Sequence, residues 1–304
     1  MVNHFPPDRG LTARMLLTMF LIGLLYVVFI GVLLAVGVSY FLIVLIAGGL
    51  LFAQYFFSDR IALASMRAHE VDARQAPQLH TMIERLCVLA NLPKPRIAVS
   101  DSPMPNAFAA GRNQKSSVVC VTTGLMEKLD EPELEGVLAH ELSHIAHRDV
   151  AVMTIASFLG MLAGLITRFG FYSGAYGGGY GRDNDNNSAG SMILVVVLVS
   201  VVVYAVSFLL TRALSRYREL SADRAAATVT GRPSSLASAL VKVSGEMARI
   251  PQRDLRRAEP LNAFFFAPAL SKGFSLSSVF STHPSLERRL EQLSAIESNM
   301  GSGA

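Results

Sequence analysis

The stretch His140-Glu141-Leu142-Ser143-His144 determines how the rest of the chain is interpreted. Its two histidines are four residues apart, so on an α-helix both imidazoles lie on one face, one turn apart. Two imidazoles placed in this way can bind the same tetrahedral Zn²⁺ ion. Glu141, beside the first histidine, can take a proton from a water molecule and pass it to a leaving amine. The H-E-x-x-H pattern is a signature of zinc proteases. The alternative interpretation is a solvated helix whose two histidines bind nothing.

The residues that precede this stretch predict where its helix begins. Asp130 suits the N-cap position, and Glu133, three residues later, completes a capping box. Pro132 fits the first turn of the same helix. Apolar residues recur at helical spacing and would face a core: Leu134, Val137, Leu138 and Ile145.

The composition predicts a membrane protein. Hydrophobic residues make up 51% of the 304 residues, and charged residues make up only 16%, against about a quarter in a soluble domain. The net charge of +4 is modest, and no basic stripe interleaved with aromatic residues is present, so we expect no nucleic-acid partner. Cys87 and Cys120 sit in apolar runs without a C-x-x-C pair, which predicts buried thiols and no cysteine metal site.

Uncharged runs predict four transmembrane helices. A cytoplasmic N-terminus at 1–14 precedes residues 15–58, which carry no charge and are long enough for two spans with a turn at Gly37-Val38-Ser39. Residues 150–211 would form two further spans around a loop at 168–190 that is rich in glycine, tyrosine and asparagine.

The remaining segments predict a catalytic domain built from two parts, 59–149 and 212–304. Basic residues flank the expected spans, and an even number of crossings separates the two parts, so both should lie in the cytoplasm. A helix is expected over 76–91. Strands are expected at 96–99, 106–110 and 117–121, the last two as a hairpin. The fold class is therefore mainly α with a small β-hairpin or sheet.

A second constellation, Arg218-Glu219-Leu220-Ser221-Ala222-Asp223, can complete the metal site. A zinc site with an open position for water needs one more protein ligand than the two histidines supply. Glu219 and Asp223 share a helix face at i, i+4 spacing. We assign Glu219 as the ligand and Asp223 as the acceptor that holds a ligating imidazole. From their chemistry alone, the two acidic residues could exchange these roles.

The last expected helix opens at Ser281-Thr282-His283-Pro284 and carries Arg289. His283 and Arg289 could lie beside the metal and stabilise a tetrahedral oxyanion. Taken alone, His283 is better interpreted as a helix cap or a surface residue. Residues 251–280 match no pattern with a clear role.

Three motifs in this order, HELSHIAHRD, RELSAD and STHPSLERRL, resemble the HtpX heat-shock membrane proteases of bacteria, which are relatives of the CAAX prenyl endopeptidases. The resemblance implies a zincin-like endopeptidase in the bacterial inner membrane, with a cytoplasmic catalytic domain and one Zn²⁺ per chain, that clears misfolded membrane proteins. It implies that His140, His144 and Glu219 bind zinc and that Glu141 is the general base. Asp223 matches the aspartate that holds a ligand, and His283 and Arg289 match groups near the scissile carbonyl.

The resemblance also implies that Asn106, Ala107, Phe108 and Ala109 form an edge strand beside the active site. A substrate peptide added to this strand would be held mostly by main-chain hydrogen bonds, which favours broad specificity. The competing hypothesis is a membrane scaffold or regulator that binds zinc without catalysis, in which Glu141→Gln would preserve function.

Overall fold

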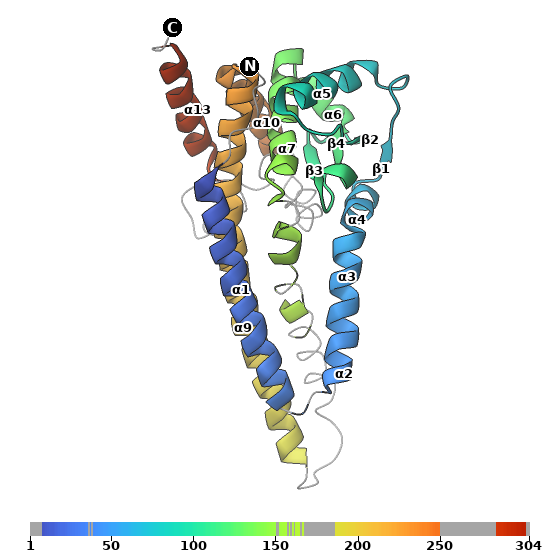
Figure 1. The fold of residues 1–304 in the computed structure, drawn as a ribbon, viewed down its shortest axis with the longest axis vertical. Helices are drawn as coiled ribbons and strands as arrows, with labels where there is room; N and C mark the ends of the chain where they lie inside the picture. The colour runs from blue at the N-terminus through green and yellow to red at the C-terminus, as the bar shows by residue number, and fades with distance from the viewer. Residues whose placement is uncertain are drawn as a thin grey trace. The chain divides into compact units, whose positions relative to one another are not determined.

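The computed structural model describes residues 8–35, 37, 39–149, 152–156, 158, 160, 162–164, 166, 186–249 and 284–301. The chain divides into two compact units, which are described separately (Figure 1). One unit comprises residues 13–56 and 152–214, and the other comprises residues 1–12, 57–151 and 215–304.

The first unit is made of apolar helices. Its described elements belong to α1 (Arg9–Ala35), α2 (Tyr40–Ile43), the π-helical turn η1 (Val44–Gly48), α3 (Gly49–Phe56) and α9 (Asn186–Thr230). Two helices are long and apolar enough to cross a membrane, Arg9–Ala35 and Leu194–Thr230. Gly37 adopts φ +85° in the expected turn after α1, a backbone conformation that glycine accepts without strain.

The number of spans is tested only in part. The expected second span is found as Val44–Phe56, bent against the helix Ser58–Ser65, and counts as a third span if the bent pair is taken together. The expected third span lies largely among residues 150–167, many of which fall outside the described residues. Four spans and a cytoplasmic catalytic domain therefore stay predictions. Asn186, expected in a loop, already belongs to α9, while 168–185 lie outside the described residues.

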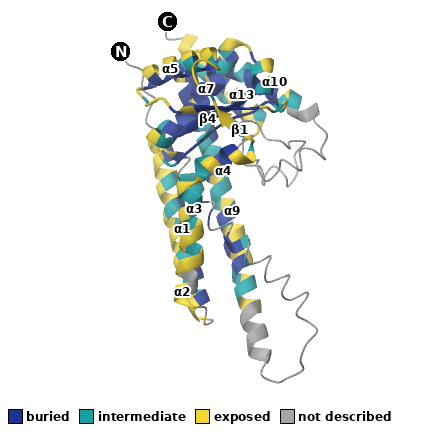
Figure 2. Ribbon diagram, turned by 90° about the vertical axis from the view of Figure 1, so that its right-hand side faces the viewer, coloured by how far each residue is buried: buried dark blue, intermediate teal, exposed yellow. Residues whose placement is uncertain are grey.

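The surface of this unit is suited to lipid. Ile22 and Phe29 of α1 pack in a buried cluster with residues of the other helices, including Phe158 and Val203. Much of the remaining surface of α1 is exposed and apolar, as Figure 2 shows in yellow: Leu16, Leu17, Phe20, Leu24, Val27 and Val28. A contiguous exposed apolar surface of this kind marks a membrane or protein interaction site, and the helix lengths favour the membrane.

The second unit contains a four-stranded sheet in the order β1-β2-β4-β3. Its strands are β1 (Ala68–Glu70), β2 (Arg96–Ser100), β3 (Ala107–Ala110) and β4 (Val118–Thr122). β3 and β4 pair antiparallel, which confirms the predicted hairpin. The short strand β1 and the parallel pairing of β2 with β4 were not predicted. β3 lies at an edge of this sheet, so one side of its backbone has no neighbouring strand in it.

Helices pack around this sheet. They are α4 (Ser58–Ser65), α5 (Pro77–Ala90), the 3₁₀ turn η2 (Gln114–Ser116), α6 (Thr123–Lys128), α7 (Glu131–Ala146), α10 (Pro233–Arg249), α13 (Leu286–Gly301) and the last part of α9. The predicted helix over 76–91 is confirmed as α5, and Thr122 caps α6 through its side chain.

The helix α7 lies at the centre of the core, and most of its residues are buried (Figure 2). The predicted capping box is present: Asp130 accepts from the Glu133 backbone, and Glu133 accepts from the Asp130 backbone. Gly136 allows α10 to approach closely, because a Cβ at this position would meet Leu236 at 3.3 Å. This packing makes α7 a rigid support for the residues that follow Gly136.

Candidate active site

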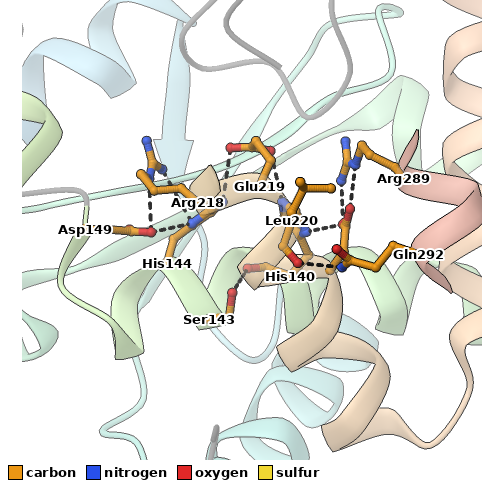
Figure 3. Close-up of polar contacts among 10 residues, drawn as sticks. His140, Ser143, His144, Asp149, Arg218, Glu219, Leu220, Arg289 and Gln292 are labelled. Carbon is orange, nitrogen blue, oxygen red and sulfur yellow. Dashed lines mark hydrogen bonds and ion pairs between the residues drawn. The ribbon is translucent and has the colours of Figure 1, made fainter. Parts of the chain in front are cut away.

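The two histidines of the motif lie together on α7. His140 and His144 are buried, and their rings meet edge to face with centroids 4.9 Å apart. Glu219, from α9, faces both rings (Figure 3). One potential ligand atom from each of the three residues lies within 4.8 Å of the others. The structure brings these three predicted residues together, although His144 and Glu219 are 75 residues apart in the chain (219 − 144).

The spacing of these atoms fits a tetrahedral metal site. The Nε2 atom of His140 lies 3.4 Å from a carboxylate oxygen of Glu219, and the Nε2 atom of His144 lies 3.6 Å from the other oxygen. Ligands about 2.0–2.1 Å from a tetrahedral Zn²⁺ are about 3.3 Å from one another. Two imidazoles and one carboxylate are also a donor set that zinc accepts in catalytic sites. The residues present therefore fit the metal that the sequence predicted.

His140 is held from behind by Asp223. The Nδ1 atom of His140 lies 2.9 Å from Asp223 Oδ1, so the remaining ring nitrogen, Nε2, faces Glu219. Burial alone would lower the pKa of His140, but hydrogen bonds to Asp223 and Glu219 outweigh it and raise the pKa to about 9. A bound cation favours the neutral ring instead, since a metal ligand must release its proton.

Asp223, which contacts His140, is also bound by Arg289. Arg289 Nε donates to Asp223 Oδ2 at 2.7 Å, and its Nη2 donates to Oδ1 at 2.6 Å. Both side chains are almost fully buried. Burial would raise the pKa of Asp223, but Arg289 and His140 lower it below its usual range. The sequence placed Arg289 near the scissile carbonyl, whereas its described contact is with the aspartate that holds His140.

His144 has a partner that the sequence analysis did not identify. The Nδ1 atom of His144 lies 2.9 Å from Asp149 Oδ2, and Arg218 Nε lies 3.0 Å from the same oxygen (Figure 3). Asp149 is 1% exposed. The signal was present as the last residue of HELSHIAHRD, but its spacing from His144 does not match a helical face, so only the fold reveals the contact.

The buried charges of the site favour a divalent cation. Among the described residues, the site contains four carboxylates, from Glu141, Asp149, Glu219 and Asp223, and two guanidinium groups, from Arg218 and Arg289. Four negative and two positive charges leave two negative charges. Uncompensated charge in a buried site is costly. One divalent cation with neutral histidines would balance the group.

Glu141 lies between the two histidines and the edge strand β3. Its side chain is buried, and its carboxylate accepts a backbone hydrogen bond from Ala109. Burial raises the pKa of Glu141 above its usual range, although the rings of His140 and His144 oppose the shift. A carboxyl with a raised pKa is better matched to proton transfer near neutral pH.

The register of β3 shows which of its backbone groups face away from β4. Thr122 donates its backbone N–H to Asn106 O, which identifies Asn106 and Thr122 as a hydrogen-bonded pair. Hydrogen-bonded pairs alternate along an antiparallel ladder. The pairs Phe108 with Cys120 and Ala110 with Val118 then face inward. The N–H and C=O groups of Ala107 and Ala109 therefore point to the open edge, beside Glu141.

One predicted site residue, His283, lies outside the described residues. Among the described residues, one cluster contains five of the predicted ones: His140, Glu141, His144, Glu219 and Asp223. The predicted substrate-binding strand β3 lies beside this cluster, next to Glu141. One helix presents two histidines and a glutamate, and a second helix presents an acidic residue as the third potential metal ligand. This arrangement defines the metalloprotease class.

Comparisons with known proteins agree with this class. Residues 73–297 match the peptidase family M48. The chain is 56% identical over 301 residues to protease HtpX homolog 1 of Streptomyces coelicolor, covering 99% of this chain and 97% of that protein. It is 56% identical over 293 residues to the protease HtpX homolog of Moorella thermoacetica, with 96% of each chain covered.

A solved structure shares the fold. The crystal structure of S. mikatae Ste24p superimposes with a TM-score of 0.53 at 17% identity, over 94% of this chain and 67% of that one. The family match covers most of the chain, and the relatives cover nearly all of it. This chain belongs to peptidase family M48 and is a membrane metalloprotease of the HtpX type.

Proposed function

We propose that this chain is a membrane-anchored endopeptidase in which His140, His144 and Glu219 hold one Zn²⁺. The observation that carries the proposal is the spacing of the three ligand atoms, 3.4 and 3.6 Å between each histidine and Glu219. That spacing fits tetrahedral zinc, and the two uncompensated negative charges of the site favour any divalent cation equally well. The affinity of such a donor set does not by itself select the metal.

When bound, Zn²⁺ would supply Lewis acidity toward a water molecule and a peptide carbonyl. The chain supplies the proton transfer. Glu141 takes a proton as the water attacks the carbonyl carbon, and it then gives the proton to the nitrogen of the breaking peptide bond. The contact with Ala109 fixes this carboxylate beside β3, where the substrate would lie. His283 remains the proposed group near the carbonyl oxygen, and Arg289 acts on the site through Asp223.

The substrate peptide, in this proposal, adds as a strand to the open edge of β3. Ala107 offers its N–H and C=O groups there and Ala109 offers its C=O group, because the Ala109 N–H is donated to Glu141 and the Asn106 backbone is occupied by Thr122. The four predicted substrate-binding residues, Asn106–Ala109, thus divide into two pairs. Backbone groups of Ala107 and Ala109 would bind the substrate, and those of Asn106 and Phe108 hold the strand in the sheet. Recognition through main-chain groups imposes little side-chain preference, which suits an enzyme that accepts many unfolded segments.

We propose misfolded or damaged membrane proteins as the substrates and the cytoplasmic face of a bacterial inner membrane as the location. The exposed apolar faces of α1 and α9 support a position in a bilayer. Basic residues on both sides of the expected spans support the cytoplasmic orientation.

Casein cleavage by detergent-purified full-length protein tests the proposal. The protein is purified under chelation, and Zn²⁺ is added back to the unmodified chain and to Glu141→Gln. We expect the unmodified chain to cleave, and the variant to bind zinc with activity at least about 100-fold lower. Equal cleavage by both would show that Glu141 is not the base. Zinc binding without cleavage by either would favour the non-catalytic scaffold.

A further inference from the structure

The backbone after α7 turns Asp149 back toward the helix. His147 ends the helix with φ −80° and ψ −3°, and Arg148 then adopts φ +56°. This left-handed conformation costs about 1–2 kcal/mol for a residue other than glycine. Strained backbone is retained mainly where the surrounding structure enforces it, often at functional sites. Here it brings Asp149 within hydrogen-bond distance of His144, five residues earlier.

Asp149 joins two groups that could not contact each other favourably. His144 Nδ1 and Arg218 Nη2 are only 3.4 Å apart. A guanidinium has only donors, so it cannot satisfy a protonated Nδ1. Asp149 Oδ2 lies 2.9 Å from the ring nitrogen, with which it forms a hydrogen bond, and 3.0 Å from Arg218 Nε, with which it forms an ion pair. The ring is thereby held with its proton on Nδ1 and its lone pair on Nε2, the atom that faces Glu219.

Arg218 also connects the two ligand-bearing helices. It precedes Glu219 on α9, while Asp149 follows α7. Burial would lower the pKa of the guanidinium, but Asp149 and Glu219 raise it. The pair repeats, on the other histidine, the arrangement of Asp223 and Arg289. Each histidine of the site thus has an aspartate on Nδ1, and each aspartate is paired with an arginine, which is buried in the case of Arg289 and partly buried in the case of Arg218.

We propose that Asp149 and Arg218 are a positioning pair that fixes His144 for metal binding, as Asp223 and Arg289 fix His140. The inference rests on the proposed function, because it assumes a cation between His140, His144 and Glu219. An outer carboxylate that orients a ligating histidine typically contributes 10- to 100-fold to metal affinity.

The test measures the Zn²⁺ affinity of the full-length protein in detergent by competition with a chromogenic chelator. We expect Asp149→Asn to weaken binding about 10- to 100-fold, and Asp149→Glu to recover part of the loss. Glu135→Gln is the matched control. It also removes a buried carboxylate of the α7 segment that is paired with an arginine, Arg85, but it touches no ligand. Its affinity should stay within about twofold of the unmodified chain.

Two further measurements separate positioning from general damage. The visible spectrum of the Co²⁺-loaded protein should change in Asp149→Asn and not in Glu135→Gln. Only Asp149 holds a metal-binding histidine, so only its replacement should change the geometry of the metal site. In a double-mutant cycle, Arg218→Lys should weaken binding alone but add little to Asp149→Asn, because both act through His144. Arg218→Lys also provides the test if Asp149→Asn fails to fold.

The outcomes are distinguishable. Zinc binding by the unmodified chain, with equal affinity in Asp149→Asn and Arg218→Lys, would overturn the positioning pair and leave the proposed function intact. Equal losses in Asp149→Asn and Glu135→Gln would also overturn it, since the effect would then be general. Failure of the unmodified chain to bind any divalent cation would overturn the inference together with the proposed metal site.

Discussion

Arg289 donates hydrogen bonds from Nε and Nη2 to the two carboxylate oxygens of Asp223, although the residues are 66 positions apart in the chain. Both side chains are almost completely removed from water. The pair joins α13 to α9 at the aspartate that holds His140. Arg289 is therefore in a position to affect both the stability of the fold and the orientation of a metal ligand.

Replacing Arg289 by alanine should destabilise the protein by about 3–5 kcal/mol, because the Asp223 carboxylate would stay buried without its cation. Thermal unfolding of the metal-free protein in detergent measures the change. Arg85→Ala is the control, since Arg85 pairs with Glu135 but is half-exposed, and its loss should cost at most about 1 kcal/mol. A similar small loss for both variants would mean that Arg289 contributes no more than a surface arginine.

Chelation should lower the unfolding temperature of the unmodified chain and leave that of Glu219→Gln nearly unchanged. A ligand that binds only the folded state stabilises it by about 2.7 kcal/mol at a free concentration 100 times Kd. Differential scanning fluorimetry with and without Zn²⁺ gives the comparison. An equal response in Glu219→Gln would place the stabilising metal somewhere else in the protein.

Acid should lower the stability of the fold by protonating Glu133 of α7, which contacts Ser238 and Lys242 of α10. Burial would raise the pKa of Glu133, but Lys242, Ser238 and the Asp130 backbone lower it below its usual value of 4.5. A lowered folded pKa means that the contribution to stability is present above 4.5 and is lost as the pH falls through the folded pKa.

The variant Glu133→Gln should therefore lose about 1 kcal/mol at pH 7, a modest value because Lys242 is half-exposed and water screens its charge. As the pH falls below 4.5, the difference between the unmodified chain and the variant should become smaller. Urea unfolding at pH 7, 5 and 3.5 gives the two curves. A constant difference between them at all three values would show that the charge of Glu133 is not the cause. Glu84→Gln, at an exposed pair with Lys94, serves as the control.

Local patterns in the sequence predicted the elements that local interactions determine. The capping box depends on Asp130 and Glu133, which are three positions apart. The hairpin of β3 and β4 depends on the connection at residues 111–117, which contains the 3₁₀ turn η2. In each case the physical cause is contained in a few consecutive residues, so the sequence was sufficient.

Contacts between distant segments were predicted only where the chemistry required a missing partner. An incomplete zinc site calls for one more ligand, and this requirement pointed to Glu219. Asp149 was not identified as the partner of His144, because it follows that histidine by five residues, a spacing that does not place the two on one face of a helix. The parallel pairing of β2 with β4 likewise joins strands that are not consecutive in the chain, so no single turn predicts it.

Arg148 offers a test of the strained turn that positions Asp149. Glycine adopts φ +56° without the steric cost that an L-residue meets, about 1–2 kcal/mol. It loses about 0.5–1 kcal/mol through the greater freedom of the unfolded chain. Arg148→Gly should thus leave stability unchanged or raise it by up to about 1 kcal/mol, and zinc affinity should be retained.

Arg148→Ala is the matched control, since it removes the same exposed side chain and keeps the strain. Thermal unfolding and chelator competition on both variants separate the two contributions. A gain in Arg148→Gly over Arg148→Ala would show that the backbone conformation is strained and that the fold maintains it to place Asp149 beside His144. If both variants lose stability or zinc affinity equally, the Arg148 side chain, and not the backbone, holds Asp149 in place.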